Sequence, residues 1–307
     1  MSKKAENNTL VRNPAYRETK HHTDAMFAFN VYPCTIPTDF TFVPLHWHDS
    51  MEIIYVKRGN GVVQVDFHTY TADAGEIFLV QPGHLHGLRS IFKKRMEYEN
   101  IIFDMSFLGS ESVDLCSQKY LLPIESGKIQ LPTHIGKNHE LYPSISACLN
   151  TTDNLCALRT GGYELGVKGQ LMTLFSLLLQ IADQQKVPSP DSVSYKNVEK
   201  LKSVLSRIEL NYDKKLSIND IAGECGYSAS HFMRWFKEVT GSGFLGYLIE
   251  YRLNRAASAL RDTNDTILDI AERNGFENLS NFNRLFKKKF EMTPSQFRRN
   301  WSGTGYF

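Results

Sequence analysis

Hydrophobic residues follow a strand-like pattern in the first third of the chain. Between residues 27 and 107, short apolar runs such as residues 52–56 are separated by turn-forming residues at 58–61 and at Pro82-Gly83. Many short strands bounded by such turns are typical of a β-sandwich or a small barrel. The pattern therefore predicts an all-β domain, with a turn at residues 58–61.

The pattern becomes helical after residue 138. Apolar side chains at the spacing of one wide helix face are Leu165, Leu171, Met172, Leu174, Phe175, Leu178, Leu179 and Ile181. Such a face needs a partner, which we expect to be the barrel, the helix around residues 141–149, or the same helix of a second subunit. Residues 186–192 are rich in Pro and Ser and predict a linker.

The last third of the chain contains one pattern twice. Ser217-Ile218-Asn219-Asp220-Ile221-Ala222, then Gly226-Tyr227, returns as Thr266-Ile267-Leu268-Asp269-Ile270-Ala271, then Gly275-Phe276. Phe232, Arg234, Phe236 and Lys237 return as Phe282, Arg284, Phe286 and Lys287. Each copy predicts a helix, a tight turn at glycine and a second helix, which Ser228 caps in the first copy. Apolar spacing over residues 244–260 predicts one long helix that holds the copies at a fixed separation.

The outer side of each second helix carries side chains suited to reading DNA. Arginine pairs with guanine and asparagine with adenine in the major groove, whereas lysine contacts phosphate. The candidate DNA-binding residues are Ser230, Met233, Arg234 and Lys237 in the first copy, and Leu279, Ser280, Asn283, Arg284 and Lys287 in the second, where Lys287-Lys288-Lys289 forms a basic run. The alternative is a helical domain whose basic residues are merely solvated, but matched basic positions in two copies favour DNA binding.

Residues 216–222, Gly226-Tyr227-Ser228, Phe236-Lys237, Gly241 and residues 271–294 together form a long, specific pattern. They resemble the DNA-binding domain of the AraC/XylS family of bacterial transcription regulators. The resemblance covers residues 198–301 and implies two recognition helices in successive major grooves on one face of the DNA. Glu291 stands where the family often has glycine, which changes a turn and not a DNA contact.

Four polar side chains in the strand-rich region form a second constellation, namely His46, His48, Glu52 and His86. His46 and His48 alternate along a strand and share a face with Glu52, because successive side chains of a strand point to opposite faces. With Gly59, Gly75 and Pro82, the pattern is similar to the cupin fold, which implies a small β-barrel with an internal pocket. It departs from the cupin pattern at Ser90, where asparagine is usual, and in the spacing from Gly75 to Pro82, which is one residue longer.

Two interpretations of these four residues remain open. Three imidazoles and a carboxylate can bind one divalent ion such as Fe, Mn, Ni or Zn. The same residues can instead be the metal-free polar lining of an effector pocket, or hydrogen-bonded structural groups. AraC-like regulators with such barrels usually sense small organic molecules, so the resemblance favours the metal-free pocket. Arg58 and Tyr98 are further candidate effector-binding residues.

Length and charge support a division into domains. The 307 residues exceed the usual size of one domain, and the formal net charge of +2 is unevenly spread. Residues 196–307 hold 18 Lys and Arg against 13 Asp and Glu, a formal +5, which suits a polyanionic partner. We expect an N-terminal arm (1–26), a cupin-like barrel or jelly roll (27–125), a helical dimerisation segment (126–185), a linker (186–196) and an all-α domain with two helix-turn-helix motifs (197–302).

The five cysteines are odd in number and form no CxxC pair, so we expect neither a disulfide framework nor a zinc finger. The N-terminal residues carry no apolar signal core, and the longest apolar stretch is interrupted by polar residues. These features predict a cytoplasmic protein that does not bind a membrane.

The sequence as a whole predicts a one-component transcription regulator and not an enzyme. Its barrel binds a small-molecule effector, for which a sugar is one candidate, and controls binding of double-stranded DNA by a homodimer; RNA polymerase is a further partner open to such a regulator. One alternative is a metal-dependent cupin isomerase or dioxygenase tethered to a DNA-binding domain. The other is an architectural DNA-binding protein, which predicts a barrel filled by large apolar side chains.

Overall fold

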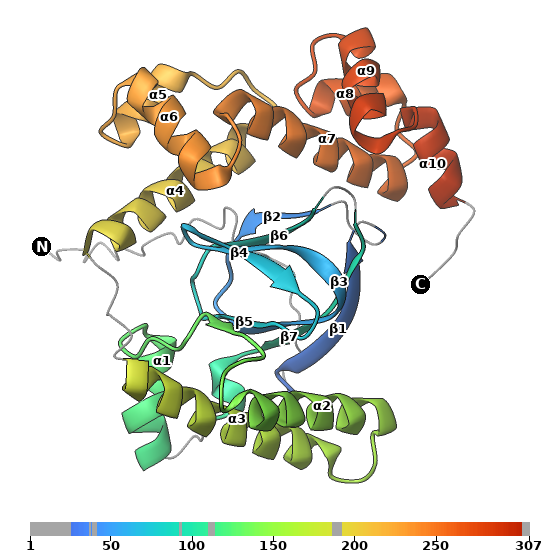
Figure 1. The fold of residues 1–307 in the computed structure, drawn as a ribbon. Helices are drawn as coiled ribbons and strands as arrows, with labels where there is room; N and C mark the ends of the chain where they lie inside the picture. The colour runs from blue at the N-terminus through green and yellow to red at the C-terminus, as the bar shows by residue number, and fades with distance from the viewer. Residues whose placement is uncertain are drawn as a thin grey trace, which may run out of the picture. The chain divides into compact units, whose positions relative to one another are not determined.

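The computed structural model describes residues 26–36, 38, 42–91, 94–109, 114–185 and 192–302. Their contacts separate the chain into two compact units, one within Tyr16–Val198 and one within Glu199–Phe307 (Figure 1). The expected N-terminal arm lies outside the described residues except for Met26. Of the expected linker, residues 186–191 also lie outside them, whereas its remainder is helical, since α4 (Ser192–Asn211) begins there.

The N-terminal unit is built on two antiparallel sheets that share one long strand. The strands are β1 (Phe29–Ile36), β2 (Phe42–His46), β3 (Met51–Val65), β4 (His68–Asp73), β5 (Ile77–Val80), β6 (His86–Ser90), β7 (Met96–Phe103) and β8 (His134–Ile135). The first half of β3 pairs with β5 and β7, and its second half pairs with β4 and β6. The strand-rich, cupin-like fold predicted from the sequence is therefore present, although β8 comes from the segment that we interpreted as helical.

The turn expected at residues 58–61 is wrong, because β3 runs through this stretch without reversing. The register against β7 shifts between Val56 and Arg58, which is the mark of a β-bulge. Gly59 has a φ of +73°, which glycine adopts without strain, and a side chain there would collide with the carbonyl oxygen of Arg95. Glycine thus bends the strand from one sheet into the other.

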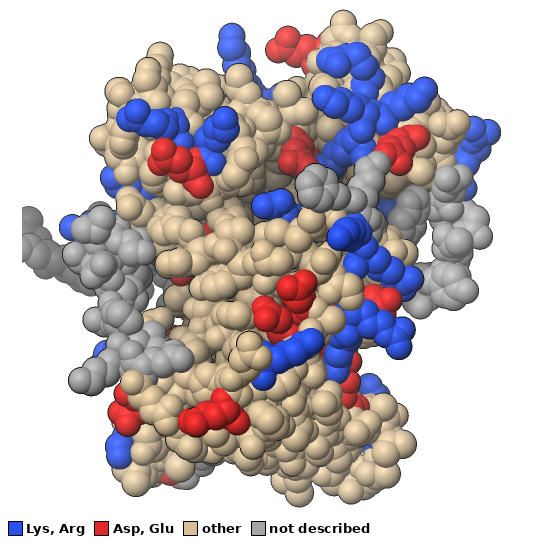
Figure 2. All heavy atoms as spheres, in the orientation of Figure 1, with Lys and Arg blue, Asp and Glu red and all other residues tan. Residues whose placement is uncertain are grey.

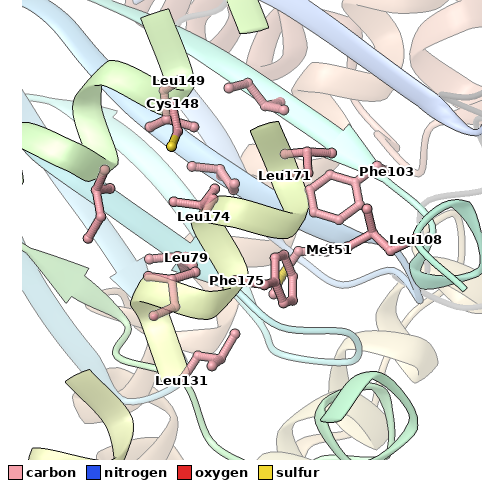
Figure 3. Packing of buried hydrophobic residues seen from close by; sticks show 14 of the residues in the cluster. Met51, Leu79, Phe103, Leu108, Leu131, Cys148, Leu149, Leu171, Leu174 and Phe175 are labelled. Carbon is pink, nitrogen blue, oxygen red and sulfur yellow. The ribbon is translucent and has the colours of Figure 1, made fainter. Parts of the chain in front are cut away.

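Two apolar cores flank the sheet that contains β5 and β7. Between the two sheets lie Ile36, Ile54, Val56, Val63, Val65, Ala72, Phe78, Val80, Leu88, Met96 and Tyr98. The outer face of the sheet packs against α2 (Tyr142–Leu158) and α3 (Tyr163–Gln185), with Leu171, Leu174 and Phe175 of α3 directed at strand residues (Figure 3). The barrel and the neighbouring helix are therefore partners of the apolar face predicted on α3.

The helix α3 is long and apolar enough to cross a membrane by length and composition alone. However, Val167, Leu171, Leu174 and Leu178 are almost fully buried in the core beneath the sheet. Burial of each Leu stabilises the fold by roughly 1.5–3 kcal/mol. This is the packing of a core helix of a folded domain.

The C-terminal unit consists of helices. After α4 come α5 (Ile218–Glu224), α6 (Ala229–Thr240), α7 (Phe244–Asp262), α8 (Ile267–Arg273), α9 (Leu279–Phe290) and α10 (Pro294–Ser302). The pairs α5–α6 and α8–α9 lie where the repeated pattern predicts them, and α7 connects them (Figure 1). A side-chain cap starts each helix of the two pairs, since Ser217, Ser228, Thr266 and Asn278 each accept a hydrogen bond from a backbone N–H of the first turn.

Candidate nucleic-acid interface and effector site

The helices α6 and α9 each bury one face and expose the other. Phe232, Trp235 and Phe236 of α6 are buried, as are Phe282 and Phe286 of α9. The opposite faces carry the candidate DNA-binding residues, of which Met233 is half-buried and the others, Ser230, Arg234, Lys237, Leu279, Ser280, Asn283, Arg284 and Lys287, are exposed. Both helices thus offer a small, polar and basic surface to a partner.

Two basic side chains of α9, Arg284 and Lys289, have partners within the protein. The guanidinium of Arg284 donates a hydrogen bond of 2.8 Å to Oδ1 of Asn281, a residue that the sequence analysis did not single out. Lys289 is half-buried and its ammonium lies 2.8 Å from Glu250 of α7, so only Lys287 and Lys288 of the basic run are exposed. Lys and Arg side chains are visible over the part of the chain that contains α9 (Figure 2).

The four polar residues of the barrel meet in the space between its two sheets. Glu52 shares a face of β3 with Ile54 and Val56, and His86 shares a face of β6 with Leu88. One potential ligand atom from each of His46, His48, Glu52 and His86 lies within 4.8 Å of the others. Glu52 is 1 % exposed and His86 is 0 % exposed, whereas His46 is half-buried. The interior is therefore apolar along most of β3 and polar at its start.

Hydrogen-bond partners fix the three rings. Nδ1 of His46 lies 3.0 Å from the carbonyl oxygen of Pro44, Nδ1 of His48 lies 3.0 Å from that of Ser50, and Nδ1 of His86 lies 3.1 Å from that of His84. A carbonyl oxygen only accepts, so each Nδ1 carries a proton. Nε2 of both His48 and His86 faces Glu52. This arrangement fits a metal ion, since metal-binding imidazoles commonly donate their other N–H to a backbone carbonyl or carboxylate.

Burial and the rings act on the carboxylate in opposite directions. Burial alone would raise the pKa of Glu52, but His86 and His48 together hold that pKa well below its usual range. Burial lowers the pKa of His86, although the charge of Glu52 opposes this. The site thus keeps a buried carboxylate in its charged form.

Arg58 does not join the four residues, and Tyr98 lies further along the same space between the sheets. Arg58 lies six positions after Glu52 on β3, roughly 20 Å along a strand, and is exposed opposite Glu97. Tyr98 is buried in the apolar core, paired with Val56. Arg58 is therefore not part of the cluster, whereas effector binding by Tyr98, which lines the same space between the sheets, stays a prediction.

Known proteins match both units. Residues 35–151 match the AraC-like ligand binding domain, and residues 221–300 match a helix-turn-helix domain. The chain is 44% identical over 100 residues to the transposon Tn10 TetD protein of Escherichia coli, covering 33% of this chain and 72% of that protein. It is 23% identical to the HTH-type transcriptional activator RhaR of Mannheimia succiniciproducens, over 83% of this chain and 87% of that protein.

A third relative is the HTH-type transcriptional regulator YdeC of Bacillus subtilis, which is 22% identical over 92% of this chain and 96% of that protein. The relatives named are regulators or share the DNA-binding region, and none of these matches is to a cupin enzyme. The chain therefore belongs to the AraC/XylS family of transcription regulators, with a ligand-binding barrel joined to a helix-turn-helix DNA-binding domain.

Proposed function

We propose that this regulator reads an asymmetric DNA element with α6 and α9, under control of an effector bound at His46, His48, Glu52 and His86. The observation that carries the DNA part is the pair of outward helix faces. α6 presents Ser230, Met233 and Arg234, whereas α9 presents Ser280, Asn283 and Arg284 at the matching positions. Because these side chains differ, the two helices recognise different bases.

The effector part rests on the polar cluster inside an otherwise apolar barrel. A buried polar group is costly unless it is paired, so a group of four convergent polar side chains points to a ligand. His46 is half-buried and gives the cluster access to solvent. A small polar molecule such as a sugar can exchange hydrogen bonds with these groups.

The orientation of the rings favours a divalent metal ion as a component of this site. His46, His48 and His86 would hold it through nitrogen and Glu52 through oxygen, and imidazole suits Zn, Fe and Ni. When bound, the ion would supply a positive charge that an oxygen atom of the effector can bind. The metal thus replaces the metal-free pocket as our favoured interpretation of the cluster.

We further propose that the protein acts as a cytoplasmic homodimer and contacts RNA polymerase. Leu158 at the end of α2 and Leu165 near the start of α3 are 73 % and 78 % exposed. Large apolar side chains so exposed are suited to a contact between subunits.

Duplexes selected from random DNA by the purified protein test the reading proposal. We expect Arg234→Ala and Arg284→Ala each to weaken binding to the selected duplex at fixed salt, whereas Lys119→Ala, at an exposed position of the N-terminal unit, leaves it unchanged. Equal affinity of all four proteins would refute the assignment of the recognition helices.

A further inference from the structure

Arg252 of α7 lies where the two helix pairs approach each other. Its Nε donates a hydrogen bond of 2.6 Å to the carbonyl oxygen of Tyr212, and its Nη2 donates one of 2.8 Å to that of Lys214. Both acceptors belong to the loop between α4 and α5, which leads into the first helix pair. A charged, planar donor bonded to two carbonyls fixes this loop on α7 more firmly than a neutral donor would.

The turn of the second helix pair closes on the same guanidinium. Gly275 stands between α8 and α9 with a φ of +77°. A β-carbon at this position would lie 2.9 Å from Cζ and Nε of Arg252 and 2.9 Å from the carbonyl oxygen of Asp213. The backbone of the turn is therefore in direct contact with Arg252 and with the loop that Arg252 holds. We call this contact of loop, guanidinium and turn the Arg252 joint.

Elsewhere between the helix pairs there is open space. A groove of about 1340 Å³ is lined by Ser230 and Met233 of α6 on one side and by Asn281 and Leu285 of α9 on the other. These residues adjoin the outward faces of the two helices, so a change in the width of the groove moves those faces relative to each other. The Arg252 joint also lines this groove, through Lys214, Arg252 and Gly275.

We propose that Arg252 is a positioning residue that fixes the separation of α6 and α9, and thereby the spacing between the two DNA elements that the protein accepts. This inference rests on the proposed reading of DNA by both helices. Adding one base pair between the elements moves the second by about 3.4 Å and rotates it by roughly 35°. A rigid joint makes the protein intolerant of such a change, whereas a loosened joint lets the second helix follow the DNA.

The test compares affinity across a spacing series. A duplex selected by the wild-type protein is altered by one or two added or removed base pairs between its elements, and each duplex is titrated with wild type, Arg252→Ala and Arg252→Lys. We expect wild type to lose at least about tenfold in affinity per base pair and Arg252→Ala less than about threefold. Arg252→Lys is expected to fall between them, because a single ammonium does not reproduce the planar fork. Arg261→Ala, at an exposed position near the C-terminal end of α7, serves as the control and should match wild type.

The outcomes separate this inference from the function on which it rests. If the Arg252 variants show the same dependence on spacing as wild type, the positioning role is wrong. If scrambling either element leaves wild-type affinity unchanged, the proposed reading of DNA fails instead. Thermal melting shows whether each variant is folded. If Arg252→Ala does not fold, the spacing series is compared between wild type and Arg252→Lys instead.

Discussion

His48 and His86 direct their Nε2 atoms at the same oxygen of Glu52, at 2.7 Å and 3.0 Å. Because both Nδ1 atoms donate to backbone carbonyls, a ring that also donates Nε2–H to this oxygen carries a positive charge. Neutral rings would instead turn nitrogen lone pairs toward the carboxylate at hydrogen-bond distance. A metal ion bound between these atoms would remove the repulsion, because the Nε2 lone pairs and the Glu52 oxygen would then all coordinate the ion.

Replacement of Glu52, the carboxylate that both rings face, should strongly weaken metal binding. We expect wild-type protein loaded with Zn²⁺ and passed through a desalting column to retain about one ion per chain, because three imidazoles and one carboxylate supply its preferred ligands. Glu52→Gln should lower the Zn²⁺ affinity at least about 100-fold, since loss of mere outer-shell partners already costs 10–100-fold. Metal analysis of the protein and calorimetric titration measure both quantities.

Glu99→Gln is the matched control, since Glu99 is a half-buried carboxylate of the same unit that lies outside the cluster. Equal zinc retention by Glu52→Gln and Glu99→Gln would contradict the assignment. Wild-type protein that retains none would leave the metal-free effector pocket as the better interpretation.

Mutations at the N-cap of α6 and on its outer face should have different effects, the first on stability and the second on DNA binding. Ser228→Ala removes the acceptor of the His231 N–H and should destabilise the C-terminal unit by about 1 kcal/mol. Ser230→Ala lies two residues further on, is exposed, and should leave stability unchanged while weakening DNA binding. Urea unfolding followed by Trp235 fluorescence, with the other two tryptophans replaced by Phe, measures the first effect. Equal stability losses in both variants would count against the capping role.

Interactions near in sequence were predictable, and those between distant strands were not. The caps and buried faces of α6 and α9 follow from spacings of three and four residues, so the helix pairs were correctly expected. Gly59 and Gly61 are compatible with a turn and with a β-bulge alike. The pairing of β3 with β7 makes this stretch a bulge and not a turn. The local sequence pattern does not reveal which strand pairs with β3.

The same limit explains which site residues were found. His46, His48 and Glu52 do meet as expected, but not on one strand face, because a bend separates β2, which ends at His46, from β3, which contains Glu52. Arg58 lies beyond a bulge in β3, which the sequence does not reveal. Lys289 looked like part of a basic run because its partner Glu250 belongs to another helix. Arg252 carried no signal in the sequence, since its partners are backbone carbonyls.

Arginine and lysine on α9 should affect DNA binding in different ways. Arg284→Ala is expected to weaken binding to the selected duplex by about 1–3 kcal/mol and to relax preference at one base pair, because arginine pairs with a base edge. Lys287→Ala should instead weaken binding to all duplexes similarly and lower the salt slope by about one. Titrations at several salt concentrations against single-base variants measure both. Identical profiles for the two variants would refute this division of roles.

The N-terminal unit should lose stability as pH rises through neutrality because of Glu99. Its carboxylate on β7 lies 2.7 Å from Nζ of Lys57, which also lies 3.3 Å from Asp153 of α2. Burial, together with the neighbouring Asp153, raises the pKa of Glu99 to about 7, although Lys57 opposes this. In the unfolded chain the pKa is near 4.3, so between these values the folded state binds more protons than the unfolded state.

The contribution of Glu99 to stability is therefore fully present below about pH 4.3 and is lost as pH rises through about 7. Glu99→Gln keeps the neutral shape of the side chain at every pH. We expect the stability of wild type relative to Glu99→Gln to decrease from pH 5 to pH 8 and then to level off. Urea unfolding followed by Trp47 fluorescence, with Trp235 and Trp301 replaced by Phe, reports on this unit. A difference that stays constant or increases over this range would show that Lys57 dominates and keeps the carboxylate charged.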